Sequence, residues 1–180
     1  MHNLEEIVEG CKNNNRKAQK LLYDRYSPIM MGICMRYALS TDEAQDILQE
    51  GFFKILKQIN QFQGKGSFEG WMKRIMVNTA ITNYRRNLKH YNQYDIDDVH
   101  SNVNSTSMYN SDFTQEELLK LIRELPKGYR VIFNLYAIEG YKHKEIAEML
   151  DIDIATSKSQ YSRAKKVLRT KMEEVSKIKI

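Results

Sequence analysis

The sequence predicts an all-α protein with two small helical domains. Long stretches of its 180 residues carry apolar side chains at helical spacing, and only two prolines, Pro28 and Pro126, interrupt them. An apolar fraction of 42% is enough for packed cores, which excludes a disordered chain. One segment near the middle lacks any apolar period and separates the two helical halves.

Four helices fit the first domain, residues 1–90. We expect Pro28 to kink or split the second helix, Thr41 to cap the third and Ser67 to cap the fourth. Gly51 lies inside the third helix at a cost of about 1 kcal/mol relative to alanine, which indicates close packing at that position. The expected helices cover about residues 3–12, 16–39, 42–59 and 68–90.

Residues 91–111 read YNQYDIDDVHSNVNSTSMYNS and contain no basic residue, so we interpret them as a flexible acidic linker. The second domain then covers residues 112–180. Pro126 is expected to stop its first helix, and Gly140 to end its second with a left-handed cap. The expected helices cover about residues 112–125, 127–137, 143–150 and 154–172.

The last two of these helices have the pattern of a helix-turn-helix. In the second of the pair, Tyr161, Ala164 and Leu168 are spaced i, i+3, i+7 and should pack inward. Six basic residues and no acidic residue lie between Ile154 and Lys171, which suits a helix docked in the major groove. The expected DNA-binding residues here are His143, Lys144, Thr156, Lys158, Ser159, Gln160, Ser162, Arg163 and Lys166. The bland alternative is a solvated amphipathic helix.

The first domain carries an acidic helix followed by a basic one. Its third helix has Asp42, Glu43, Asp46 and Glu50 on neighbouring turns. The fourth helix mixes basic side chains with aromatic and amide side chains. This composition suits single-stranded DNA, because the basic side chains neutralise phosphates while nucleobases stack on the aromatic rings. The competing reading is that its aromatic residues are simply core and its charges simply solvated. The residues concerned are Phe68, Trp71, Lys73, Arg74, Asn78, Thr79, Asn83, Arg85 and Arg86.

Nothing in the sequence favours an enzyme or a membrane protein. The GKGS stretch at residues 64–67 lacks the spacing of a phosphate loop, and the four histidines are scattered, so we expect no metal and no cofactor. Cys11 and Cys34 have no ligand spacing and are interpreted as reduced core thiols. There is no signal peptide or long apolar run, so a cytoplasmic location is expected.

Three motifs in this order resemble the extracytoplasmic-function (ECF) sigma factors of bacterial RNA polymerase. The stretch DEAQDILQEGFFKIL (42–56) is similar to the family's polymerase-binding segment, and FEGWMKRIMVNTAITNYRR (68–86) to its promoter-melting and minus-ten segment. Residues 125–169 resemble the minus-thirty-five-binding domain. The resemblance covers roughly residues 16–172. Departures from the family pattern are Gly51, Lys57, Asn83 and Asp151, the last in a turn where glycine is usual.

The resemblance implies an all-α transcription initiation factor whose partners are core RNA polymerase, promoter DNA and an anti-sigma factor. The implied polymerase-binding residues are Asp42, Glu43, Asp46, Gln49, Glu50 and Phe53. A loop would hold a flipped-out base of the minus-ten element, and it contains Gln63, Gly64, Lys65, Ser67 and Phe68. The alternative is an ordinary two-domain helix-turn-helix regulator that binds duplex DNA unaided and is not a polymerase subunit.

Overall fold

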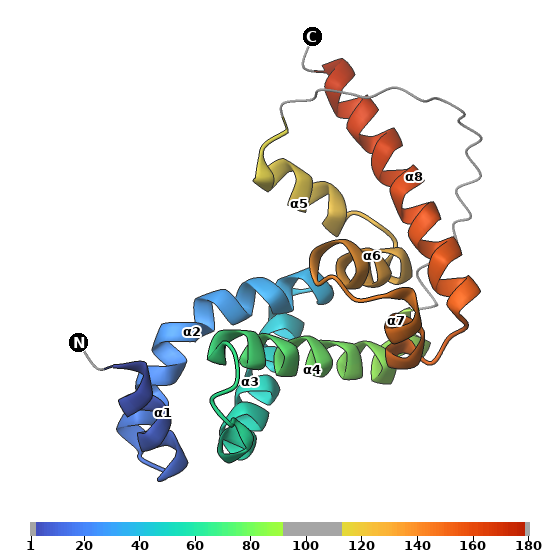
Figure 1. Cartoon of the computed structure of the whole chain (residues 1–180). Coiled ribbons are helices and arrows are strands. Elements are labelled where there is room, and N and C mark those ends of the chain that lie inside the picture. The colour runs from blue at the N-terminus through green and yellow to red at the C-terminus, as the bar shows by residue number, and fades with distance from the viewer. Residues whose placement is uncertain (1–2, 92–112, 179–180) are drawn as a thin grey trace. The chain divides into compact units, whose positions relative to one another are not determined.

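The computed structural model describes residues 3–91 and 113–178, which form two helical units (Figure 1). One unit ends at Arg86 and the other begins at Asn87. Every regular element in the described ranges is a helix, so the predicted all-α fold is confirmed. Apart from Tyr91, the expected linker 91–111 lies outside the described residues.

The first unit is built from α1 (Leu4–Lys12), α2 (Arg16–Tyr37), α3 (Thr41–Gln58), the 3₁₀ turn η1 (Ile59–Gln61) and most of α4 (Phe68–Tyr91), whose residues after Arg86 lie beyond the division between the units. Helix α2 packs against both α1 and α3. The core consists of apolar side chains at helical spacing on all of these elements, including Ile7, Leu22, Met30, Ile33, Ile47, Ile55, Ile59, Met72, Met76 and Val77. This core fixes α3 and α4, the two helices that carry the charged patches.

Two details of this unit differ from the prediction. Ser40, not Thr41, caps α3, because the Ser40 hydroxyl accepts a hydrogen bond from the Glu43 amide at 3.1 Å. Helix α2 ends at Tyr37, two residues earlier than expected, and of the two outcomes expected at Pro28, a kink or a split, the continuous helix excludes the split. Tertiary packing explains the continuity, since α2 buries residues on both sides of the proline, from Leu22 to Tyr37.

The second unit consists of α5 (Gln115–Arg123), α6 (Lys127–Phe133), the π-helical turn η2 (Asn134–Ile138), α7 (His143–Leu150) and α8 (Ile154–Ile178). Helix α8 packs against α5, α6 and α7. One of its core clusters joins Leu121 and Leu125 of α5 and its following turn to Ala164 and Leu168 of α8. The inward face predicted for the basic helix is therefore confirmed.

The boundaries of three helices in the second unit differ from the prediction, and α5 ends at Arg123 instead of residue 125. Helix α5 begins after the N-cap Thr114, whose hydroxyl accepts from the Glu117 amide. Helix α6 ends at Phe133, four residues earlier than expected, and a π-helical turn follows it. In this turn the Glu139 amide donates a hydrogen bond to the Asn134 carbonyl at 2.9 Å. Helix α8 continues past residue 172 because Met172 and Val175 pack against the α5–α8 cluster.

Two backbone positions with positive φ shape the helix-turn-helix. Gly140 has φ +79° before α7, as a left-handed cap requires, and this part of the prediction is confirmed. Asp151 has φ 57° and ψ 52° directly after α7, where aspartate tolerates the left-handed conformation better than most residues. The short turn to α8 therefore forms without the usual glycine.

Candidate functional site

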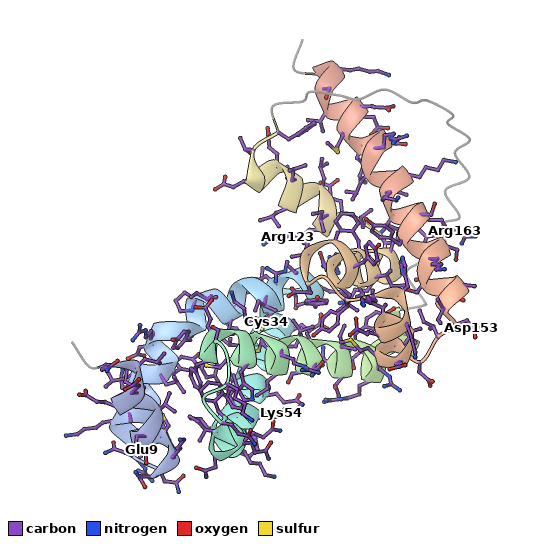
Figure 2. All side chains as sticks on the ribbon, in the orientation of Figure 1. Glu9, Cys34, Lys54, Arg123, Asp153 and Arg163 are labelled. Carbon is purple, nitrogen blue, oxygen red and sulfur yellow. The ribbon has the colours of Figure 1, made fainter. Side chains whose placement is uncertain are left out.

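The outer face of α8 collects exposed basic and hydroxyl side chains. Arg163 lies on the side of the helix that faces away from α6 (Figure 2). Lys144 at the start of α7 is also exposed, whereas Thr156 and Gln160 are half-buried. The exposed members of the predicted set on α8 are Lys158, Ser159, Ser162, Arg163 and Lys166. This surface has the composition that duplex recognition needs, with cations for phosphates and hydroxyls for base edges.

His143 differs from the rest of this set because its ring has partners inside the protein. Its Nδ1 lies 2.9 Å from the Oγ of Ser157, and its ring stacks on Tyr136 with centroids 4.3 Å apart. Burial, followed by the nearby charge of Lys158, lowers the pKa of His143 below its ordinary value. The sequence alone suggested contact with DNA phosphate or water, and it contained no sign of the Ser157 bond.

Helix α3 exposes an acidic face with a large apolar side chain beside it. Asp42, Asp46 and Gln49 are exposed, and 67% of Phe53 is accessible to solvent. An exposed phenylalanine among carboxylates is the composition expected of an interface with a basic partner that offers an apolar contact.

The other two acids of α3 bond to α4 instead. Glu43 Oε1 accepts from Asn83 Nδ2 at 2.8 Å, and Glu50 Oε2 lies 3.3 Å from Arg86 Nη2. Lys54 adds to this polar seam, since its Nζ is 2.7 Å from Glu50 Oε1 and 3.4 Å from Thr79 Oγ1. The bond from Lys54 is the largest cause that holds the pKa of Glu50 below its usual value. Residues predicted for two different partners thus contact each other.

Helix α4 divides its predicted DNA-binding residues between surface and core. Arg74, Asn78 and Arg85 are exposed, and Lys73 pairs with Glu69 at 2.6 Å. Thr79 is 1% exposed and donates to the Ile75 carbonyl at 2.9 Å. Its side chain therefore has a structural role here.

The aromatic side chains at the start of α4 form a packed group. Phe68 is 5% exposed and stacks on Trp71 with centroids 5.5 Å apart, while Phe62 contacts both rings. For Phe68 the structure supports the core interpretation over a base-stacking role. Trp71 is half-buried, so part of its ring reaches the surface.

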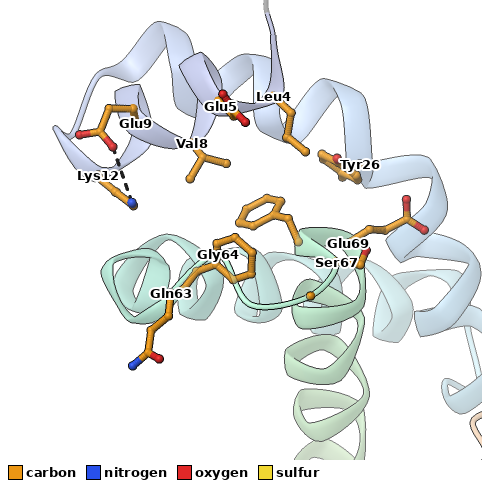
Figure 3. Close-up of a pocket in the computed structure, with 13 residues that line it drawn as sticks. Leu4, Glu5, Val8, Glu9, Lys12, Tyr26, Gln63, Gly64, Ser67 and Glu69 are labelled. Atoms are coloured by element: carbon orange, nitrogen blue, oxygen red, sulfur yellow. Dashed lines mark ion pairs between the residues drawn. The ribbon is translucent and has the colours of Figure 1, made fainter.

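A pocket of about 880 Å³ opens between α1 and the loop before α4 (Figure 3). Leu4 and Val8 of α1 face the loop across it, and Gln63, Gly64 and Ser67 line the other side. Gly64 and Gly66 have φ of +72° and +85°, which favours glycine at both positions. The part played by α1 was not predicted, because its proximity to a loop some fifty residues later depends on tertiary structure.

Neither a metal cluster nor a membrane span is found within residues 3–91 and 113–178. No three of the described His, Cys, Asp and Glu side chains gather where they could hold a metal ion. None of the described helices is long and apolar enough to cross a bilayer. Both cysteines are unpaired and buried, and burial raises the pKa of the Cys34 thiol to about 12.

Comparisons with known proteins give a match for each of the two helical units. Residues 22–90 match the family model for Sigma-70 region 2, and residues 115–168 match that for Sigma-70, region 4. The chain is 28% identical over 178 residues to the ECF RNA polymerase sigma-E factor of Haemophilus influenzae, covering 93% of this chain and 94% of that protein. It is 26% identical to the Escherichia coli K12 factor of the same name, with 93% of each covered.

A solved structure shares the fold. It contains a sigma factor from Bartonella quintana in complex with an anti-sigma factor, and its TM-score is 0.51 at 19% identity, with 86% of this chain and 96% of that chain covered. Region 2 followed by region 4 defines the class of two-region sigma factors. This chain belongs to the sigma-70 family, as an ECF RNA polymerase sigma factor. The family is one of transcription initiation factors and is not a class of enzymes.

Proposed function

We propose that the chain binds core RNA polymerase through α3, opens and reads the minus-ten element with α4 and the preceding loop, and reads the upstream element with α8. The observation that carries this proposal is the separation of charge. Carboxylates and Phe53 are exposed on α3, and basic side chains are exposed on α4 and α8. Opposite charge on separate helices lets one protein bind a basic polymerase surface and nucleic acid at once.

The pocket between α1 and the loop supports a role in holding a flipped-out base. Its 880 Å³ is ample for a nucleobase, and its apolar walls are provided by Leu4, Val8 and Phe62. The backbone of Gly64 and Gly66 leaves the loop side open, since no atom lies within 4 Å of a Cβ built at either position. Within this proposal, Phe68 supports the pocket wall.

The partners proposed are core RNA polymerase, promoter DNA in duplex and single-stranded form, and an anti-sigma factor. The last follows from the Bartonella structure, whose sigma factor is held by an anti-sigma factor. Together these partners imply action in the cytoplasm, where the polymerase and its template are found. The alternative of a duplex-binding regulator leaves the region 2 match and the exposed face of α3 without a role.

Charge reversal on α3 tests the proposal. Asp46→Arg is expected to weaken binding to core polymerase at least tenfold, because like charges then meet at the interface. Asp46 is exposed, so the fold should persist, and circular dichroism checks this. The matched control is Asp24→Arg on α2, remote in sequence from the α3 face. Equal core affinity for Asp46→Arg and the parent chain in a fluorescence binding assay would remove α3 from the interface.

A further inference from the structure

His143, Ser157 and two tyrosines form a cluster that joins three consecutive elements of the helix-turn-helix. His143 is the first residue of α7, Ser157 and Tyr161 lie on α8, and Tyr136 lies on the π turn η2. The Tyr136 ring contacts both His143 and Tyr161, with centroids 4.3 and 4.5 Å away. The cluster therefore connects the start of one helix to the first two turns of the next.

The bond between His143 and Ser157 is the polar centre of this cluster. Ser157 is 0% exposed, and its Oγ lies 2.9 Å from His143 Nδ1. A hydroxyl buried in this way needs a partner, because it cannot recover its lost hydrogen bonds from water. Losing the ring would leave the hydroxyl unsatisfied at the contact between α7 and α8.

The stacking holds the imidazole at a fixed angle. The planes of His143 and Tyr136 are 16° apart, while Tyr161 meets the imidazole edge-on at 61° and 5.7 Å. Tyr136 reaches this position from a π turn, where the wider backbone interrupts the α-helical pattern of the preceding helix. Such turns often occur at functional sites.

The surroundings of His143 do not suit a phosphate ligand. A phosphate contact is strongest with a charged imidazolium, but burial and Lys158 both disfavour the charged form. The ring also lies in the first turn of α7, where the helix dipole opposes a positive charge. The neighbouring Lys144 is exposed and better placed for a backbone contact.

We infer that His143 is a positioning residue for α8, setting the angle at which Ser159 and Arg163 meet the upstream promoter element. The inference rests on the proposed function of α8. Ser157 and Ser159 are two residues apart, so the anchored and exposed positions lie on different sides of the same helical turn. A small rotation of α8 would displace its exposed side chains from the base edges that they read.

The test uses holoenzyme, made from core polymerase and the full chain, on a promoter recovered by run-off transcription from genomic fragments. Ser157→Ala removes the hydroxyl and little volume. His143→Asn keeps an amide near the Nδ1 position, whereas His143→Gln moves it towards Nε2. We expect Ser157→Ala and His143→Gln to reduce the preference for the intact over a scrambled upstream element about fivefold to tenfold, with His143→Asn closer to the parent.

Two further measurements separate positioning from direct contact or general destabilisation. The slope of log affinity against log salt should stay unchanged, whereas a lost phosphate contact lowers it by about 0.9 for duplex DNA. The double variant Ser157→Ala with His143→Gln should be no worse than His143→Gln alone, because that single variant already breaks the bond to Ser157. The control is Ser176→Ala on α8, whose hydroxyl bonds only to the Met172 carbonyl of its own helix among the contacts described.

The possible results are distinct. A parent holoenzyme that ignores the upstream element would contradict the proposed function of α8. A parent that requires this element, together with an unaffected Ser157→Ala variant, would overturn the positioning role alone. A lower salt slope for His143→Gln but not for Ser157→Ala would assign His143 to DNA contact. If Ser176→Ala lost the preference for the intact upstream element to the same extent, the effect would be explained by a general loss of stability, and the positioning role would be wrong.

Discussion

At the scale of single residues, the glycines inside helices differ in how closely their neighbours approach. Gly51 is the clearest case, since a Cβ added there would lie 2.4 Å from the Sδ of Met76, which is itself fully buried. Gly32 on α2 has no atom within 4 Å of the same position. The two helical glycines therefore differ in the space around them, and substitution by alanine should change the free energy of unfolding in opposite directions.

We expect Gly51→Ala to lower the free energy of unfolding of the first unit by about 1–3 kcal/mol, because a buried methionine must move. Gly32→Ala is expected to raise it by about 0.5–1 kcal/mol through helix propensity. Denaturant unfolding followed by the fluorescence of Trp71, the one tryptophan, reports on this unit. Equal stability of the two variants would contradict the close packing of α3 on α4.

At the scale of elements, the polar seam between α3 and α4 links the proposed polymerase and DNA surfaces. Glu43 and Glu50 of α3 hold Asn83 and Arg86 of α4. Each of these carboxylates can bind either its partner on α4 or a basic side chain of the polymerase. Each of the α4 side chains can bind either its carboxylate on α3 or DNA. Such shared contacts couple the two surfaces by ordinary competition.

Removing one charge of the seam should change how the chain binds single-stranded DNA. In Glu50→Gln, Arg86 loses its anionic partner and can neutralise one more phosphate. The salt slope for a fluorescent oligothymidylate of about twenty nucleotides should then steepen by about 0.7. Asp24→Asn on α2 removes the same charge from its pair with Lys20 and serves as the control. An identical change in both variants would indicate a net-charge effect only.

The seam also gives the first unit a dependence on pH. The bond from Lys54, together with the bond and charge of Arg86, holds the pKa of Glu50 below its ordinary value of 4.5. The stabilisation is therefore complete above about pH 4.5 and is lost as pH falls through the lowered pKa. The free energy of unfolding of the parent should decrease as pH falls below about 4.5. The free energy of unfolding of Glu50→Gln should depend less on pH in this range. Unfolding free energies that change equally with pH in the parent and in Glu50→Gln, measured by Trp71 fluorescence, would contradict this prediction.

For the whole molecule, the proposed function requires two helical units that offer different surfaces to one polymerase–promoter complex. The second unit should provide sequence specificity, since α8 exposes Arg163, Ser159 and Lys166 together. Losing one side chain from this face should affect promoter choice while leaving the first unit and its polymerase contacts intact.

We expect Arg163→Ala to weaken recognition of the upstream element by about 1–3 kcal/mol, the range for one lost base contact. Transcription by holoenzyme on templates with intact and scrambled upstream elements measures this. Arg123→Ala, which removes an exposed arginine from α5, is the matched control. If Arg163→Ala transcribes like the parent from every promoter that needs this element, α8 docks by another face.

The sequence by itself determined the all-α class, the family and most helices. Periodic apolar residues specify which face of a helix is buried, as with Ala164 and Leu168, and this information is local. It also located the charged patches, because consecutive helical turns bring acids or bases together without tertiary contacts. The turn at Asp151 and the cap at Gly140 were likewise predictable from residues next to each other.

The tertiary structure decided which charged and polar side chains face solvent. Glu43 and Asn83 are 40 residues apart yet hydrogen-bonded, and Thr79 is buried by the packing of its helix. Likewise, α1 faces the loop across the pocket, and His143 bonds to Ser157 fourteen residues later. Helical periodicity specifies the direction of a side chain around its own axis. Its partner depends on how two axes cross, which only the packed core determines.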